Sequence, residues 1–566
     1  MPDEQMDVVL CWHMHQPNYW DRERNEYRLP WTYLHGIKDY VDMAAHIENC
    51  PNAKAVVNFT PTLLEQIDDY SQQVNVHLSH GLPIKDPMLR ALTSPVMPCE
   101  SAERVKLVHA CMKANENRMI NRFPAYRRLA DIVNYFSESE NDFAYLGGQF
   151  IVDLLMWYHI TWMGEVVRLG DTRIQSLIEK GREFTFSDRK LLVGVVAELL
   201  ASIIPRYKAL AEQGRVELSV TPYAHPIAPI LLDVHSTKDA MPDAPLPDMA
   251  EYPGGESRML WHIEEGLRVF KHYFGFEPKG CWPAEGAVSA ATAEQLDQVG
   301  FAWMASGQTV LHNSLVSGGH EDHLPHHWLH QSYQMGGQNI RQFFRDDGLS
   351  DLIGFHYADW HADDAVSNMV NHIENIQISC ENPERQIVSI VLDGENAWEY
   401  YPDNGIHFLS GLYEKLVASD KLNLTTFDEH LAKQETNVGD LTSMVAGSWV
   451  YGTFSTWIGD HDKNRGWEML RDVKLAFDEA ASENTLPAER FAEASKQLAV
   501  CEGSDWFWWF GDYNSAQSVS DFECLFRIQL SHLYQLLNKE PPEYLGHSFT
   551  YGGGHPENDG VMIRNS

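Results

Sequence analysis

Ionisable and polar side chains follow several short apolar runs in this sequence of 566 residues. One run ends at Glu285, which stands between a Pro-Ala step and a glycine in GCWPAEGAVS. Other apolar runs lead into HMHQP (13–17), TPYAHP (221–226), the Asp346–Asp347 pair and DGENAWE (393–399). In parallel α/β architectures the carboxyl ends of the strands meet at one edge and carry the chemistry. The sequence therefore predicts one shared site built from distant segments.

Two carboxylates in such a site could carry out glycoside hydrolysis. One carboxylic acid protonates the leaving oxygen, while a second carboxylate acts as nucleophile or activates water. The acid needs a pKa raised by burial or by the other carboxylate, and the nucleophile needs hydrogen-bond donors that keep it ionised. Glu285, with Asp346 or Asp347, is the candidate pair. The candidate donors are His13, His15 and Arg345.

The two histidines of HMHQP also suit a metal site. His13 and His15 are two residues apart, so on a strand both side chains face the same way. Two such histidines and an acid can hold zinc, and His225 and Asp393 could complete the site if the fold brings them there. The protein would then be a metal-dependent hydrolase, such as a deacetylase of sugars. The sequence has no HExxH motif, and local spacing fixes no third ligand.

The acidic candidates also have purely structural interpretations. Glu285 could be a salt-bridged acid at the edge of the core. Asp346 and Asp347 precede a glycine, so either could form a turn or cap a helix that starts near Leu349. No GxSxG, P-loop or GxGxxG motif follows a strand, so serine-esterase, nucleotide-phosphate and dinucleotide chemistry have little support.

The composition narrows the class of partner. There are 43 Lys and Arg against 80 Asp and Glu, a net charge of −37. Phosphate binding needs a basic face, so a nucleic-acid partner or an anionic membrane surface is disfavoured. Many of the 17 tryptophans stand beside polar residues. Such rings can stack on sugars, or they can pack the edges of a large core.

The cysteines and the N-terminus predict a cytoplasmic, soluble protein. The eight cysteines are scattered and form no CxxC pair, which favours free thiols in a reducing compartment. The acidic N-terminus lacks the basic start of a secretory signal. No run reaches the roughly 18–20 apolar residues of a membrane span. The sequence gives no indication of the oligomeric state.

The elements that position these residues are apolar runs alternating with helical patterns. The predicted strands are 7–12, 53–59, 215–220, 280–284, 301–306, 340–345 and 386–394, and the helices include 256–275, 289–300 and 362–376. This alternation predicts an α/β fold with a parallel sheet, open or closed into a barrel. A helical insertion is expected at about 88–213. We expect a catalytic domain at 1–415 and a mainly helical C-terminal domain at 416–566.

Five motifs of the chain resemble those of a known family. HMHQP, GRVELSVTPYAHP, WPAEGAV, FFRDDGLSDLIGF and LDGENAWEYYPDNG occur in the order and spacing of the sequence blocks of glycoside hydrolase family 57. The resemblance continues outside the blocks across nearly all of the chain, for example at GSWVYGTFSTWIGDHDKNRGWEML. The chain looks most similar to the α-amylase and amylopullulanase-like members. In branching enzymes the fourth block usually continues differently after the Arg-Asp.

The resemblance implies a retaining enzyme that acts on α-glucans such as starch, glycogen or maltooligosaccharides. It implies an incomplete (β/α)7 barrel and a helical C-terminal region that completes the substrate cleft. Glu285 would be the nucleophile, and Asp346 would be the general acid/base, with Asp347 its most easily confused neighbour. Residues implied in substrate contact or support are His13, His15, Glu217, His225, Trp282, Arg345, Asp393, Glu395, Trp398, Glu399 and Trp449. The family needs no metal or cofactor for its chemistry.

Related activities remain open. The family also contains 4-α-glucanotransferases and branching enzymes, which use the same two carboxylates. Hydrolysis or transfer depends on whether water or a sugar hydroxyl reaches the glycosyl-enzyme. A zinc-dependent deacetylase-like hydrolase is a further alternative. A non-catalytic glycan-binding protein is the last, and the presence of both Glu285 and Asp346 argues against it.

Overall fold

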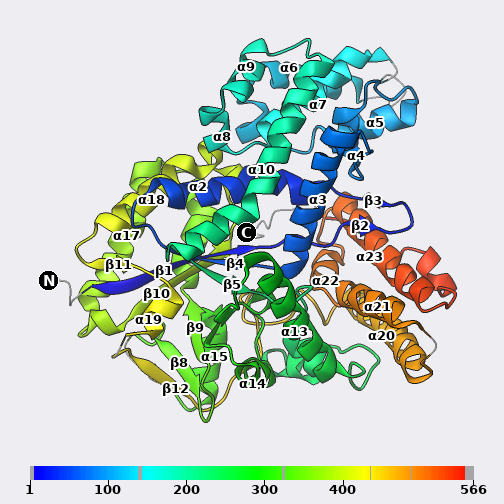
Figure 1. The fold of residues 1–566 in the computed structure, drawn as a ribbon. Coiled ribbons are helices and arrows are strands. Elements are labelled where there is room, and N and C mark those ends of the chain that lie inside the picture. The colour runs from blue at the N-terminus through cyan, green and yellow to red at the C-terminus, as the bar shows by residue number, and fades with distance from the viewer. Residues whose placement is uncertain are drawn as a thin grey trace.

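The computed structural model describes residues 5–554, except 138–142, 144, 321–323, 325–326, 434 and 485. A ten-stranded sheet forms its centre, and helices surround the sheet (Figure 1). Its parallel strands run in the order β10 (Ile387–Asp393), β1 (Met6–Met14), β4 (Ala55–Phe59), β5 (Val216–Val220), β6 (Gly280–Cys281), β7 (Trp303–Gly307) and β9 (Arg341–Arg345). These strands confirm the predicted alternation.

The outer strands of this series, β9 and β10, meet and close the sheet into an incomplete barrel. The Asp346 amide donates to the Ser389 carbonyl at 2.8 Å, and Arg345 Nε donates to the Val391 carbonyl at 2.8 Å. Three further strands extend the sheet, namely β8 (Ser332–Met335) beside β9, β12 (Val438–Leu441) beside β8, and β11 (Leu422–Leu424) beside β1. The predicted fold class is confirmed.

The strands are buried on both faces, which explains their nearly continuous apolar sequences. Every residue of β1 and of β4 is buried. Side chains that alternate along the strands, such as Val9, Val56 and Phe343, form a separate cluster inside the barrel. Their neighbours, such as Val8 and Val57, pack outward into the larger core shared with the helices.

The barrel helices begin and end with the signals found in the sequence. Ser289 caps α14 (Ala290–Val299) by accepting from the Thr292 amide at 3.2 Å, and Gly300 ends it at φ 100°. The others are α1 (Trp31–His35), α2 (Val41–Asn49), α3 (Pro61–His80), α13 (Gly255–Phe274), α15 (Gln308–Ser317), α16 (Asp347–Asp351), α17 (Ala362–Ser379) and α18 (Ile406–Ala418).

Two groups of helices lie outside the barrel. The insertion, at the top of Figure 1, comprises α4 (Pro87–Thr93), α5 (Ser101–Ala110), α6 (Pro124–Phe136), α7 (Gly148–Thr161), α8 (Glu165–Gly170), α9 (Thr172–Lys180) and α10 (Phe186–Glu212). The C-terminal helices, at the right, are α20 (His461–Ser482), α21 (Ala488–Cys501), α22 (Asp505–Trp509) and α23 (Ala516–Leu536). Strands β11 and β12 both follow residue 415, so the sheet extends beyond the expected domain boundary. Nowhere in the described ranges is a helix both long and apolar enough to cross a bilayer.

A short helix, α19 (Phe427–Leu431), covers the amino end of the barrel. The Asp428 amide donates to Glu217 Oε2 at 3.0 Å, and Trp303 Nε1 donates to Glu217 Oε1 at 2.6 Å. Glu217 is the second residue of β5, so it lies at the amino end and not at the mouth where substrate was expected. Burial raises the pKa of Glu217 to about 7, and the two hydrogen bonds oppose that rise.

Asp7 forms a second buried polar cluster at the same end. Its Oδ1 accepts from Asn423 Nδ2 at 2.6 Å, while its Oδ2 lies 2.7 Å from His430 Nδ1 and 2.6 Å from Lys433 Nζ. Burial alone would raise the pKa of Asp7, but His430 and Lys433 outweigh burial and lower it. Both carboxylate oxygens of Asp7 are therefore paired with other side chains of the protein.

Candidate active site

Glu285 stands on a tight turn that begins where β6 ends. The strand stops at Cys281, before the predicted end at residue 284, because Pro283 has no N–H to donate to a neighbouring strand. The turn that follows, η6 (Ala284–Gly286), holds Glu285 at φ 57° and ψ 22°. This left-handed conformation is strained for a residue with a side chain, and such strain is often found at functional sites.

Two tryptophans pack tightly around this turn. Gly286 has φ 56°, and a Cβ there would lie 3.0 Å from the Trp282 ring and 3.3 Å from Trp449 Cβ. A side chain at this position would therefore be strained by the backbone angle and would crowd both tryptophans. The Trp449 amide also donates to the Glu285 carbonyl at 3.1 Å, so the loop that carries Trp449 fixes the turn in place.

The carboxylate of Glu285 has partners from three distant parts of the chain. Trp449 Nε1 donates to Oε2 at 3.1 Å, Ser504 Oγ lies 3.5 Å from Oε1, and His225 Nδ1 lies 3.9 Å from Oε1. The donors expected for this carboxylate were His13, His15 and Arg345. The structure corrects this expectation, because those side chains are bonded to other groups.

The surroundings of Glu285 favour its protonated form. Burial, together with the negative charge of Asp393, raises the pKa of Glu285 to about 8. Asp505 adds to the rise, while the hydrogen bonds from Trp449 and Ser504 oppose it. The ligand-free carboxyl therefore holds its proton at neutral pH.

His13 and His225 form a buried pair beside Glu285. Their Nε2 atoms are 3.1 Å apart. His13 Nδ1 lies 2.7 Å from Asn58 Oδ1, and His225 Nδ1 lies 2.8 Å from Ser504 Oγ. Burial lowers the pKa of His13 to about 3 and that of His225 well below its usual value, with a further contribution from His15 to both. Both rings are therefore neutral.

His15 belongs to a group that bears on the zinc alternative. Across the described residues, His15, His225 and Asp505 are the group whose possible ligand atoms all lie within 4.8 Å of one another. This set includes neither His13 nor Asp393. His15 Nε2 is bonded to Asp505 Oδ1 at 2.7 Å, and its ring stacks on His225 with centroids 3.8 Å apart and planes at 14°. Lone pairs of stacked imidazoles run side by side, so the set does not converge on a tetrahedral ion.

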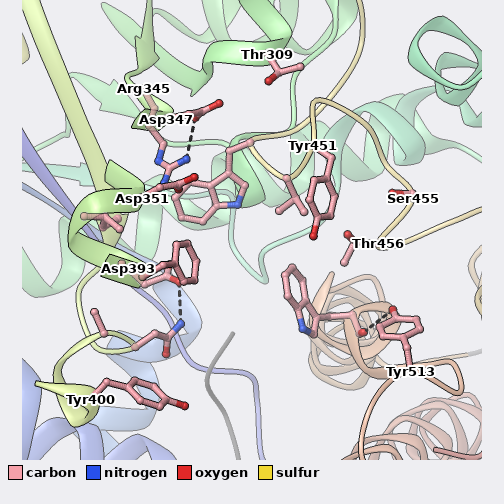
Figure 2. Close-up of a pocket in the computed structure, with 18 of the residues that line it drawn as sticks. Thr309, Arg345, Asp347, Asp351, Asp393, Tyr400, Tyr451, Ser455, Thr456 and Tyr513 are labelled. Atoms are coloured by element: carbon pink, nitrogen blue, oxygen red, sulfur yellow. Dashed lines mark hydrogen bonds and ion pairs between the residues drawn. The ribbon is translucent and has the colours of Figure 1, made fainter. Parts of the chain in front are cut away.

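A cavity of about 530 Å³ opens beside these groups (Figure 2). Asp347, Asp351 and Asp393 lie on one side of it, and Tyr451 and Tyr513 lie across from them. Its aromatic lining consists of Phe355, Tyr400, Trp449, Tyr451, Trp508 and Tyr513. Such a mixture of rings and carboxylates is suited to a sugar chain. Glu285 adjoins this cavity through Trp449, which lines it and donates to the Glu285 carboxylate, although Glu285 is not itself among the lining residues.

Arg345 organises the acidic side of the cavity. Its Nη1 donates to Asp347 Oδ1 at 2.8 Å, and its Nη2 donates to Asp351 Oδ1 at 2.9 Å. Burial raises the pKa of Asp347, and Arg345 opposes that rise. Burial also raises the pKa of Asp393, whose Oδ2 accepts from Asn396 Nδ2 at 2.8 Å. The cavity thus offers buried carboxyls that can carry a proton.

Asp346 has a different environment from its neighbour. Its Oδ1 caps α16 by accepting from the Leu349 amide at 2.9 Å, and its Oδ2 lies 3.1 Å from His330 Nε2. It is not among the residues that line the cavity, whereas Asp347 is. The cap interpretation of this aspartate is confirmed. Its implied role as acid/base stays a prediction.

The remaining implied residues support the site from behind. Glu395 Oε1 accepts from the His15 amide at 3.1 Å and from Tyr40 Oη at 3.1 Å, and so ties HMHQP to the helical layer. Burial raises the pKa of Glu395 well above its usual value. Trp282, Trp398 and Glu399 are likewise buried and do not line the cavity. Trp282 packs against Trp449 at 5.1 Å between ring centroids, so it backs that indole.

Residue-by-residue reasoning missed Ser504 and Asp505. Both lie in GSDWFWWFGDYNS, whose mixture of aromatic and polar residues is visible in the sequence. Trp508 and Tyr513 of the same stretch line the cavity. The aromatic-polar mixture could have marked the segment, but no local signal indicates that Ser504 would meet a carboxylate 219 positions earlier.

Comparisons with known proteins agree with this architecture. The family described as "Glycosyl hydrolase family 57" matches residues 9–441. No curated protein matches the chain. The fold is similar to a branching enzyme of Thermococcus kodakaraensis, with a TM-score of 0.56 and 12% identity over 94% of this chain and 90% of that chain. It is also similar to an α-amylase of Thermotoga maritima, with a TM-score of 0.54 and 12% identity over 94% and 93%. A 4-α-glucanotransferase of Thermococcus litoralis has a TM-score of 0.51 and 14% identity over 94% and 60%.

Proposed function

Because this chain belongs to glycosyl hydrolase family 57, we propose that it cleaves α-glucosidic bonds in α-glucans with retention of configuration. The observation that carries the proposal is the placement of Glu285. A strained turn holds its carboxyl against the indole of Trp449, which lines an aromatic cavity with three aspartates. The similar solved structures are named as a branching enzyme, an α-amylase and a 4-α-glucanotransferase.

In the proposed double displacement, Glu285 attacks the anomeric carbon while a carboxylic acid protonates the departing glycosidic oxygen. The same acid then deprotonates water or an acceptor sugar. The aromatic residues of the cavity would hold neighbouring sugar rings by stacking. Arg345 and Asp393 would contact sugar hydroxyls, because both line the cavity with polar atoms.

The acid/base is one of the two aspartates that follow Arg345. The family resemblance implies Asp346. The cavity geometry favours Asp347, because it lines the cavity and burial raises its pKa. Both oxygens of Asp346 are bonded, to the Leu349 amide and to His330. These two assignments are separated by a pair of variants described in the Discussion.

Hydrolysis is the first candidate, and glycosyl transfer is the second. The cavity favours neither by itself, but its aromatic side, with Tyr451, Trp508 and Tyr513, offers stacking surface for an acceptor sugar. Transfer needs such an acceptor site, because a sugar hydroxyl must compete with water at the glycosyl-enzyme.

Incubation of the purified protein with maltoheptaose tests the proposal. A rise in reducing ends that matches substrate consumption indicates hydrolysis, and products longer than the substrate without such a rise indicate transfer. Amylose, glycogen and pullulan, assayed in parallel, report the linkage that is cut. Absence of turnover of all four glucans would remove the proposed function.

A further inference from the structure

Ser504 reaches the barrel on a firmly anchored segment. The preceding Glu502 is fully buried, and its carboxylate accepts from Arg258 Nη2 at 2.8 Å and from Tyr252 Oη at 2.7 Å, with His262 Nε2 also at 2.8 Å. Burial would raise the pKa of Glu502, but Arg258 and His262 lower it to about 2. An ionised carboxylate that is hydrogen-bonded to three side chains therefore fixes the segment just before Ser504.

The backbone on either side of Ser504 is fixed as well. Gly503 pairs with Pro226, and a Cβ at Gly503 would lie 2.8 Å from the Ala224 carbonyl. The Ser504 amide donates to the His225 carbonyl at 2.9 Å. The main chain thus fixes the position of the Ser504 hydroxyl, and the residue is only 1% exposed.

From that place the hydroxyl joins Glu285 to the histidine pair. The chain of contacts runs from Glu285 Oε1 to Ser504 Oγ at 3.5 Å, then to His225 Nδ1 at 2.8 Å. It continues from His225 Nε2 to His13 Nε2 at 3.1 Å and ends at Asn58 Oδ1, 2.7 Å from His13 Nδ1.

Asn58 sets the direction of the hydrogen bonds along this series of contacts. Its Nδ2 donates to Ser219 Oγ at 3.1 Å, which leaves Oδ1 to accept a hydrogen from His13 Nδ1. A neutral His13 then accepts at Nε2 from His225, and a neutral His225 accepts at Nδ1 from the Ser504 hydroxyl. While Glu285 is protonated, the single hydrogen of Ser504 points to His225 and its oxygen accepts from Glu285. When Glu285 is ionised, Ser504 donates to Oε1, and this is the hydrogen bond that opposes the rise in the pKa of Glu285.

We propose that Ser504 is a positioning residue that relays the proton of Glu285 to the His13–His225 pair. The Glu285 Oε1–H bond breaks as a Ser504 Oγ–H bond forms, and the original Ser504 Oγ–H bond breaks as a His225 Nδ1–H bond forms. The products are a Glu285 carboxylate and a singly protonated histidine pair, so the net charge of the site does not change. The hydroxyl then donates to the carboxylate. This inference rests on the proposed role of Glu285 as nucleophile.

The charged groups around this chain come from several elements. His13 lies near the end of β1, and His15 follows that strand. His225 follows β5, Asp393 ends β10, and Asp505 begins α22. Asp393 and Asp505 favour a proton near Glu285, and His15 disfavours a proton on the pair. Burial lowers the pKa of both histidines below that of Glu285, so the transfer is unfavourable in the ligand-free site and is completed only as Glu285 attacks the anomeric carbon. During that step the Glu285 carboxylate, 3.9 Å from His225 Nδ1, stabilises the protonated pair.

The test compares the full-length wild type with Ser504→Ala, Ser504→Thr and the control Ser495→Ala. Ser495 is a buried serine whose hydroxyl donates to the Phe491 carbonyl within α21. Two readouts are taken at a series of pH values. One is kcat and kcat/KM on maltoheptaose, and the other is carbodiimide labelling of Glu285, measured by peptide mass spectrometry without reference to activity. Carbodiimides react with the protonated carboxyl.

Ser504→Ala should lower kcat about tenfold, as expected for the loss of one hydrogen bond to an ionised group, with little change in KM. In Ser504→Ala, the acidic limb of the pH profile of kcat/KM and the Glu285 labelling curve should both move to higher pH. Ser504→Thr should recover both, and Ser495→Ala should match the wild type. Unchanged kcat and labelling in Ser504→Ala would overturn the relay. The relay would also be overturned if Ser504→Thr had the wild-type melting temperature but the low kcat expected for Ser504→Ala. A wild type without α-glucan turnover would remove the proposed function, while the labelling curves would still decide whether Ser504 is coupled to Glu285.

Discussion

The two ends of the barrel both bury charged side chains, but they use them in opposite ways. At the amino end, each carboxylate oxygen of Asp7 and Glu217 has a partner within 3.0 Å. At the carboxyl end, Glu285 has one partner at 3.1 Å and one at 3.5 Å. The buried Glu395 Oε2, also at that end, has no hydrogen-bond partner among the described residues.

This difference separates charged residues that stabilise the fold from charged residues that can take part in a reaction. Burial raises the pKa of both Glu217 and Glu285, so a raised pKa does not by itself mark a functional group. The distinguishing features of the carboxyl end are incomplete pairing, a strained turn and a cavity of about 530 Å³. A carboxyl must have room for a reaction partner before its pKa can matter for catalysis.

The largest expected contrast is between the glutamates of the two ends. Glu285→Gln should lower kcat on maltoheptaose by about a thousandfold or more, because the amide cannot form the glycosyl-enzyme. Glu217→Gln should retain most of the wild-type kcat, because the hydrogen-bond partners of Glu217 are Trp303 and residues at the start of α19, at the amino end of the barrel. Steady-state kinetics and circular dichroism of both variants check this. Comparable losses in two folded variants would contradict the contrast between the ends.

The same contrast can be sharpened within one dipeptide. Asp347→Asn should lower kcat by about a hundredfold or more, since an amide cannot donate and recover a proton. Asp346→Asn should cost less than about tenfold, because asparagine also caps a helix well. The ratio of the two kcat values is the measurement. A larger loss in Asp346→Asn would support the assignment implied by the family resemblance.

At the amino end the effect should appear in stability and not in activity. Asp7→Asn should lower the free energy of unfolding by about 2 kcal/mol, because it removes the buried anion that is bonded to His430 and to the partly exposed Lys433. The pKa of Asp7 is lowered in the fold, so its contribution is present above the unfolded value near 3.8 and is lost as pH falls through the folded value. Urea unfolding at pH 7 and at pH 3 measures both parts. An equal difference from wild type at the two pH values would refute the linkage.

The smallest expected effect is a shift in a pH profile. The charge of Asp393 raises the pKa of Glu285, so Asp393→Asn should move the acidic limb of kcat/KM about one unit lower. Asp351→Asn is the matched control, because Asp351 lines the same cavity but is bonded to Arg345. The acidic limb of kcat/KM in Asp351→Asn should stay at its wild-type pH. A limb that moves equally in both variants would show that general charge removal, and not Asp393, sets the pKa of Glu285.

Much of the fold could be predicted because local patterns determine it. Fully buried strands need apolar runs, and α14 has its serine and glycine signals in the sequence. The grouping of His13, His225 and Glu285 followed from the rule that strand ends meet at one edge. Glu217 could have been placed at the amino end as well, because it is the second residue of its strand.

The rest of the site could not be predicted because it depends on contacts without local periodicity. Trp449 and Ser504 reach Glu285 from loops 164 and 219 positions away. Their positions depend on packing, such as the pairing of Gly503 with Pro226. The partners of the two neighbouring aspartates were equally open, because a strand that ends at Arg345 can turn either carboxyl toward the cavity.

The anchoring of Ser504 has a consequence for the order in which the protein is made. Residues 9–441, which the family description spans, contain Glu285 but neither Trp449 nor Ser504. During translation the barrel can therefore emerge from the ribosome and begin to fold before the groups that hold its central carboxylate have been synthesised. The proposed activity is therefore expected only after the segment that carries Trp449 and Ser504 has docked on the barrel.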